Sequence, residues 1–150
     1  MFPWGADWAW SLPLILLTVV IHVFGLTIIN ERVVRIMSGT THRRSLMPIF
    51  VMVMCIAVLL MTALHTMEGS AWAGAYRLLG ALPDRKTAML YSLGAMTTFG
   101  HANLFLEQQW QMMGVLEALN GVLLFGLTTA FLFAMIQEVW GIRSRQRSPP

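Results

Sequence analysis

The sequence contains little charge and a single cysteine. Only 11% of its 150 residues are Asp, Glu, Lys or Arg, whereas a soluble domain carries about 25%. Hydrophobic residues make up 57% and the mean hydropathy is +0.65, so the composition indicates a membrane protein. Cys55 lies inside an apolar run. It permits no intrachain disulfide, and we interpret it as a small packing residue.

Positive charge is also missing from the start of the chain, where no Lys or Arg precedes Arg32. This absence excludes the basic region of a signal peptide, so we expect the first apolar run to remain in the protein as a helix. Most of the Lys and Arg residues lie between or after apolar runs. Membrane topology therefore explains the sequence pI near 9.8, and nucleic-acid binding is not predicted.

The sequence also lacks the residue patterns of an enzyme. No nucleophile–base pair, phosphate-binding glycine loop or metal-ligand cluster is evident, so we predict neither catalysis nor a cofactor. His22 and His65 are expected at different depths of the membrane, the first near the inner end of its helix and the second near the outer end of its own. A haem between them is therefore not predicted, and His22 is interpreted as a packing or hydrogen-bonding residue rather than a proton sensor.

Three apolar runs are long enough to cross a membrane core of about 30 Å at about 1.5 Å per residue. They cover residues 11–29, 47–67 and 112–139. The first helix is expected to extend over residues 8–37, and the tryptophans at its start are interpreted as an interfacial anchor.

The basic residues give an expected orientation. Loop 30–46 and tail 142–150 carry most of the Lys and Arg, so both are expected in the cytoplasm. Three spans then place the N-terminus and residues 68–110 outside. We expect a multi-pass protein of a bacterial inner membrane, with its C-terminus in the cytoplasm.

Two short helices are predicted between the second and third runs. Residues 70–80 are expected to form an interfacial helix that ends at Gly80. Asp84 is a natural N-cap for a helix over residues 85–96. This helix is too short to cross a membrane and too apolar to lie in water, so we predict a re-entrant half-helix buried by neighbouring protein.

The string Thr-Thr-Phe-Gly-His-Ala-Asn follows the half-helix at residues 97–103, and a block that begins Gly-Val-Leu-Glu covers residues 114–131. In this order, the two blocks resemble the two-transmembrane pore domain of tetrameric bacterial potassium channels, whose filter string is Thr-Thr-Val-Gly-Tyr-Gly-Asp. The resemblance covers residues 47–140, and the first helix lies outside it.

Together with the three apolar runs, the resemblance implies an all-α membrane protein with three transmembrane helices and one re-entrant pore helix per chain, forming a homotetramer around a central pore. Its parts would be the N-terminal helix with the basic loop (1–46), the pore domain (47–141) and a basic tail (142–150). Because no internal repeat is evident, a closed ring requires identical copies. The expected partners are other copies of the chain and the lipid bilayer.

The ion filter implied by the resemblance consists of Thr97, Thr98, Phe99, Gly100, His101, Ala102 and Asn103. The backbone carbonyl groups of Thr98, Phe99 and Gly100 would coordinate K⁺ or Na⁺ as permeant ions. The chain would then be a cation channel that conducts passively.

The filter string departs from that of potassium channels at its last three positions. His101 and Asn103 replace the tyrosine and aspartate that brace the filter, and Ala102 replaces the second glycine. Alanine in the left-handed region costs about 1 kcal/mol or more, so we expect a wider outer filter with weak selectivity for K⁺ over Na⁺. The alternative is a non-conducting, channel-derived structural or regulatory subunit. A ring of His101 side chains would titrate near neutral pH and repel cations when protonated.

Two polar residues near the start of the third run are candidates for filter support. Glu117 and Asn120 share a helical face and would form hydrogen bonds behind the filter. The alternative for Glu117 is a solvated carboxylate near the outer interface.

The rest of the third run contains candidates for opening the pore. Gly121 and Gly126 would be hinges or close contacts between helices. Further along, Leu127, Phe131 and Met135 recur at a spacing of four residues. They would form an apolar gate or pack in the core.

Overall fold

The computed structural model describes residues 5–38, 46–101 and 103–147, and these residues fold into helices and connecting loops without a strand. The elements, in chain order, are α1 (Gly5–Ser38), α2 (Leu46–Leu78), α3 (Arg85–Met96), the short 3-10 helix η1 (Gln108–Trp110) and α4 (Gln111–Arg147). The predicted all-α class is confirmed over the described residues.

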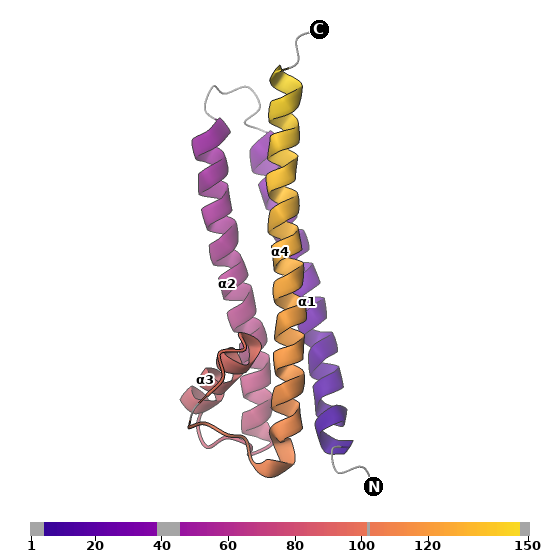
Figure 1. The fold of residues 1–150 in the computed structure, drawn as a ribbon, viewed down its shortest axis with the longest axis vertical. Helices are drawn as coiled ribbons and strands as arrows, with labels where there is room; N and C mark the ends of the chain where they lie inside the picture. Colours follow the sequence, from indigo (N-terminus) through magenta and orange to yellow (C-terminus); the bar gives the residue numbers. More distant parts are fainter. Residues whose placement is uncertain (1–4, 39–45, 102, 148–150) are drawn as a thin grey trace.

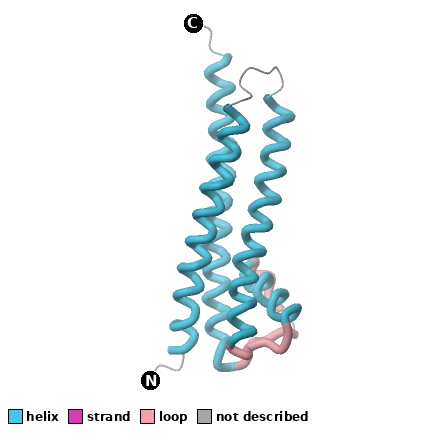
Figure 2. The backbone as a smooth tube through the Cα atoms, turned by 180° about the vertical axis from the view of Figure 1, so that it is seen from behind, coloured by secondary structure: helices cyan, strands magenta, loops and turns pink. Residues whose placement is uncertain are grey.

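The three long helices run side by side, and α3 lies against one end of the bundle (Figure 1). Both α1 and α3 pack against α2 and α4. The start of α1, the start of α4 and α3 lie at the same end, whereas α2 begins at the opposite end, where α4 finishes. Seen from behind, the described loops gather around α3 (Figure 2). Residues 68–110 and the start of α1 thus share one side of the bundle, as the distribution of basic residues predicts.

Three described segments are long and apolar enough to cross a membrane: Gly5–Ile36, Met47–Leu78 and Gln108–Glu138. Large apolar side chains such as Leu16, Phe24 and Leu59 point outward and are largely exposed. A continuous apolar exterior of this kind suits contact with lipid. The prediction of three helices that are long and apolar enough to cross a membrane is therefore confirmed.

One element differs from the prediction, because α2 continues without a break where the sequence predicts a separate helix over residues 70–80. Trp72 and Tyr76 are fully buried in a cluster that includes residues of α3 and α4, and this packing keeps the last turns of α2 in line. The predicted stop at Gly80 is confirmed. Its φ of 68° lets the Ala81 N–H donate to the Tyr76 carbonyl at 2.9 Å.

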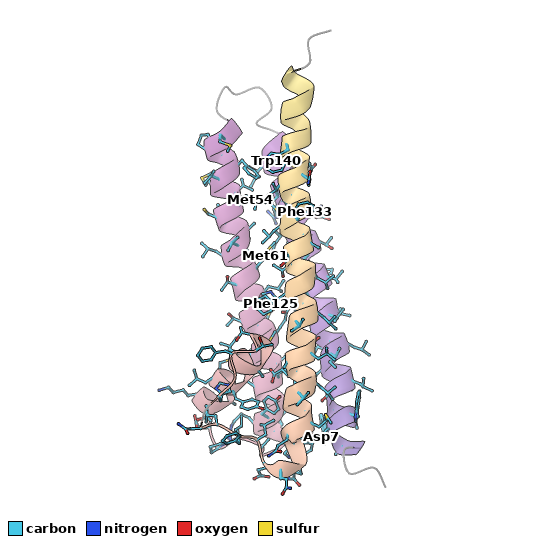
Figure 3. The ribbon with its side chains drawn as sticks, viewed as in Figure 1. Asp7, Met54, Met61, Phe125, Phe133 and Trp140 are labelled. Carbon is cyan, nitrogen blue, oxygen red and sulfur yellow. The ribbon has the colours of Figure 1, made fainter. Side chains whose placement is uncertain are left out.

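The buried apolar residues form two clusters along the bundle. One lies at the α3 end and includes Trp72 and Met113. The other includes Met61 and Met135, and Figure 3 labels Met61 near the middle of α2. Along α2, the buried His65 lies between the two clusters, so polar groups occupy the centre of the bundle.

Candidate functional site

The helix α3 begins where the sequence predicts. Asp84 accepts a hydrogen bond from the Thr87 backbone N–H at 3.0 Å and another from the Thr87 hydroxyl at 2.6 Å. These hydrogen bonds from Thr87 lower the pKa of the exposed Asp84 carboxyl below its ordinary value. The predicted N-cap is therefore confirmed.

The C-terminal half of α3 packs between α2 and α4. The Ser92 hydroxyl lies 2.7 Å from the Gly69 carbonyl oxygen of α2. On α4, Gly121 lies so close to the Met96 backbone that an added Cβ atom would overlap it. Of the two interpretations of Gly121, the close contact between helices is the one that this packing supports. Gly126 differs, because no atom lies within 4 Å of a Cβ placed there.

Glu117 of α4 joins three helices through its buried side chain. It accepts a hydrogen bond from the Tyr76 hydroxyl of α2 at 2.6 Å, and its other oxygen lies 2.5 Å from the Ser92 hydroxyl of α3. The solvated alternative for Glu117 is therefore wrong, because the side chain is buried and hydrogen-bonded. Its role in supporting a filter stays a prediction. Sequence reasoning missed Tyr76 as a partner, because no local motif links two residues 41 positions apart.

The contacts around Glu117 indicate its protonation state. Ser92 has one hydroxyl hydrogen, yet its oxygen lies within hydrogen-bond distance of both the Gly69 carbonyl and the Glu117 carboxyl. Both contacts are hydrogen bonds when Ser92 donates to Gly69 and a protonated Glu117 donates to Ser92. A neutral carboxyl also avoids the cost of a charge in a membrane-spanning helix.

The predicted filter leaves α3 in a tight turn. The backbone N–H groups of Phe99 and Gly100 lie 2.9 and 3.3 Å from the Gly94 carbonyl oxygen. Gly100 has a φ of 71° and Thr98 a φ of 56°, an unfavourable value for a β-branched residue. The predicted strain at Ala102 lies outside the described residues, and the strain within them is at Thr98.

The filter segment is not covered by other described parts of the chain. Thr97 closes α3 by donating its hydroxyl to the Leu93 carbonyl at 2.7 Å. Phe99 is 87% exposed, and Thr98 and Asn103 are exposed as well. In the single chain, residues 97–100 and Asn103 are therefore exposed.

His101 turns back onto α3. Its ring stacks on Tyr91 with centroids 5.2 Å apart, and its Nε2 atom donates to the Tyr91 carbonyl at 3.0 Å. Gly94 makes room for the ring, because a Cβ atom there would overlap it. His101 is thus held against the half-helix of its own chain.

Asn120 does not lie with Glu117 behind the filter segment. Its amide donates to the Thr18 hydroxyl of α1 at 2.8 Å, whereas Glu117 faces α2 and α3. Residues three apart on a helix differ by about 60° in direction, so the two side chains meet different neighbours. A second contact with α1 is made by Asp7, which accepts a hydrogen bond from the Met113 backbone N–H at 3.0 Å.

The residues predicted as a gate have different surroundings. Leu127 is 42% exposed, whereas Met135 is buried in the cluster that includes Val53 and Met61. Phe131 is half-buried against the same cluster. Core packing within the chain therefore accounts for Phe131 and Met135.

His22 and His65 lie side by side, and the predicted difference in depth is wrong. Their ring centroids are 5.2 Å apart, and both Nδ1 atoms approach the Glu68 carboxylate. The prediction failed because it ended the second helix at Met67. Since α2 continues to Leu78, His65 lies thirteen residues inside its end.

These side chains also form a group of possible metal ligands that sequence reasoning did not find. Donor atoms of His22, His65 and Glu68 lie within 4.8 Å of one another. A haem between the two rings is still not supported. Each ring nitrogen already has Glu68 or Thr128 as a partner, so neither ring presents a free nitrogen to an iron.

No protein-family model, curated protein or solved structure matches this chain. What the chain does must therefore follow from its own residues and their geometry.

Proposed function

We propose that four copies of the chain form a cation channel in which the carbonyl groups of Thr98, Phe99 and Gly100 surround a shared axis. The observation that carries the proposal is the position of α3 and of the turn that follows it. A short helix that ends between two long helices and leads into an exposed, non-helical turn suits an ion filter, where backbone oxygens replace the ion's water shell.

The depth of the α3 tip supports a re-entrant helix. Met96 contacts Gly121, which follows Trp110 by eleven residues, or about 16 Å along a helix. Ser92 contacts Gly69, nine residues before the end of α2, or about 14 Å. If Trp110 marks an interface, both lengths put the tip near the middle of a core of about 30 Å.

The charge distribution along α3 favours a cation at its tip. The C-terminal end of a helix carries a partial negative charge from carbonyl groups without helical partners. The basic residues Arg85 and Lys86 lie at the N-terminal end of α3, so their charges are far from the tip. The tip therefore presents the negative end of the helix dipole without a neighbouring positive side chain from α3.

The exposed turn after α3 supports assembly into a ring. Its backbone is not helical and is exposed in the single chain, and lipid does not tolerate such backbone groups. Identical copies around an axis would enclose these groups along a wet path. The number four comes from the channels that the sequence resembles.

Weak selectivity for K⁺ over Na⁺ is the second part of the proposal. The His101 ring is bonded to the Tyr91 carbonyl of α3, so it leaves the outer filter without the tyrosine hydroxyl brace of potassium channels.

Cation flux into liposomes containing the purified chain tests the channel. We expect both K⁺ and Na⁺ to pass, and we expect Gly100→Ala to reduce the flux because alanine would have to adopt a φ near 71°. Gly74→Ala is the matched control, since Gly74 lies in α2 with no atom within 4 Å of a Cβ position. The absence of flux at every tested voltage and pH would overturn the channel.

A non-conducting structural or regulatory subunit is the second candidate function. The loss of a filter glycine at Ala102 and the strain at Thr98 favour it. The mass of the assembly in detergent separates the outcomes. A tetramer without flux would support the subunit, whereas a monomer or dimer would contradict the fourfold ring.

A further inference from the structure

A closed ring of four buried side chains lies at the centre of the bundle. His22 comes from α1, His65 and Glu68 from α2, and Thr128 from α4. The Glu68 carboxylate oxygens lie 2.8 Å from His22 Nδ1 and 3.0 Å from His65 Nδ1. The Thr128 hydroxyl lies 3.1 Å from His65 Nε2 and 3.2 Å from His22 Nε2. Because all four are buried, they depend on one another for hydrogen bonds.

With an ionised Glu68 and two neutral histidines, the ring lacks one hydrogen. Each of the four contacts needs one hydrogen to be a hydrogen bond. Glu68 would contribute none, while His22, His65 and Thr128 would contribute one each. One contact would then bring two lone pairs together inside the protein, which is unfavourable.

One added proton completes the ring. If either histidine is an imidazolium, both Nδ1–H groups donate to Glu68, one Nε2–H group donates to Thr128, and Thr128 donates to the other Nε2 atom. The proton can also reside on Glu68, with the hydrogen bonds running in one direction around the ring. Both arrangements have no net charge, which suits a membrane-spanning bundle.

We propose that His22, His65, Glu68 and Thr128 form a proton-binding site that ties the three long helices together when it is occupied. Release of the proton at higher pH leaves a net negative charge and breaks one of the four hydrogen bonds. The contact of α1 with α2 and α4 then weakens. The site uses no filter residue, so it stands independently of the proposed channel.

The groups that face the ring come from α2, α4 and the segment after α3. Within the described residues, Glu68 interacts electrostatically with the two histidines of the ring. From α4, Phe125 stacks on His65 with centroids 4.2 Å apart. His65 also lines a cavity with Thr62, Thr66 and His101, to which α3 contributes no titratable side chain.

The substitution Glu68→Gln supplies the missing hydrogen covalently. The Gln amide donates to one Nδ1 atom and its oxygen accepts from the other Nδ1–H group, so the ring is complete with neutral groups. Between about pH 6 and about pH 9, we expect the unfolding temperature in detergent to fall about 5 °C more for the unchanged chain than for E68Q. All other titratable groups are the same in both proteins. An identical pH dependence would overturn the proposal.

NMR of the unchanged chain, with nitrogen-labelled histidine rings and carbon-labelled glutamate carboxyl groups, reads the protonation of the ring directly, and variants serve only to assign the signals. At about pH 7.5, where a free histidine with a pKa of about 6.5 is mostly neutral, we expect one extra proton, either on the His22 and His65 pair or on Glu68. His22→Gln and His101→Gln assign the signals. Two fully neutral rings in the pair, with no proton on Glu68, would overturn the proposal.

A metal ion is the competing occupant, because two imidazoles and a carboxylate are also ligands of Zn²⁺. It would displace the hydrogens between Glu68 and the Nδ1 atoms. After treatment with a chelator, added Zn²⁺ is expected to leave the unfolding temperature unchanged. If added Zn²⁺ raised the unfolding temperature and His22→Gln abolished this increase, the site would bind a metal ion and the proton site would be overturned.

Discussion

The Tyr76 hydroxyl of α2 donates a hydrogen bond of 2.6 Å to Glu117 of α4, and both side chains are fully buried. The pair joins the end of α2 to the start of α4, and Ser92 of α3 contacts the other oxygen of the same carboxyl. Polar contacts within one chain therefore position α3 before any second copy is considered.

Removing the Tyr76 hydroxyl tests this connection. Tyr76→Phe leaves a buried Glu117 oxygen without its donor, so we expect the free energy of unfolding in detergent to fall by about 1–3 kcal/mol. Tyr91→Phe is the control, because it deletes the same atom from a half-buried ring of α3 whose hydroxyl lies against Gly114. Equal losses in the two variants would contradict a special role for the Tyr76 hydroxyl.

The protonation of Glu117 can be tested by a neutral substitute. In Glu117→Gln, the amide can donate to Ser92 and accept from Tyr76 as a protonated carboxyl does, so we expect little change in the free energy of unfolding. Glu117→Leu leaves both hydroxyl groups without this partner and should cost about 2–5 kcal/mol. If Gln were as destabilising as Leu, the carboxyl would be ionised in the folded chain.

Two glycines of α4 should respond to alanine in opposite ways. Gly121→Ala pushes a methyl group into the Met96 backbone, so we expect a loss of about 1–3 kcal/mol in the free energy of unfolding. Gly126→Ala meets no atom and should stabilise the helix by up to about 1 kcal/mol. A destabilising Gly126→Ala would show that Gly126 packs closely in the assembled protein.

The Asp84 cap of α3 should make the stability of the folded chain depend on pH in the acidic range. Hydrogen bonds from Thr87 lower the pKa of the Asp84 carboxyl below its ordinary 3.8. The cap therefore stabilises the fold above pH 3.8, and this stability is lost as the pH falls through the lowered pKa of the folded chain. Asp84→Ala should lower the unfolding temperature at neutral pH and remove this part of the acid loss. Asp84→Asn should retain most of the cap, since a neutral amide also accepts from the Thr87 N–H. An Ala variant that loses stability in acid as steeply as the unchanged chain would contradict the assignment.

Introducing the last three residues of the potassium-channel filter string tests whether these positions account for the proposed weak selectivity. The triple change His101→Tyr, Ala102→Gly and Asn103→Asp should raise the permeability ratio of K⁺ to Na⁺ severalfold, measured as reversal potential under bi-ionic conditions. Asn103→Asp alone is the control for added charge. An unchanged ratio in the triple variant would show that selectivity is set elsewhere.

Local signals in the sequence were sufficient to predict the helices and several of their ends. The apolar runs predicted three spans, the side chain of Asp84 predicted the start of α3, and Gly80 predicted a helix stop, although of a separate short helix. Each of these features depends on residues that are close together in the sequence. A span depends on the length and hydropathy of one run, a cap on one side chain and a stop on one φ value. The pairing of Glu117 with Tyr76 could not be predicted in this way, because it depends on how two helices face each other.

The sequence by itself thus determined an all-helical membrane protein with a short, capped helix before its last span. The tertiary structure decided where α2 ends and what each buried polar side chain meets. Burial of Trp72 and Tyr76 extends α2, and this extension brings His65 to the level of His22. Periodicity specifies which residues share a face of a helix, but the packing of neighbouring helices decides which partner that face meets.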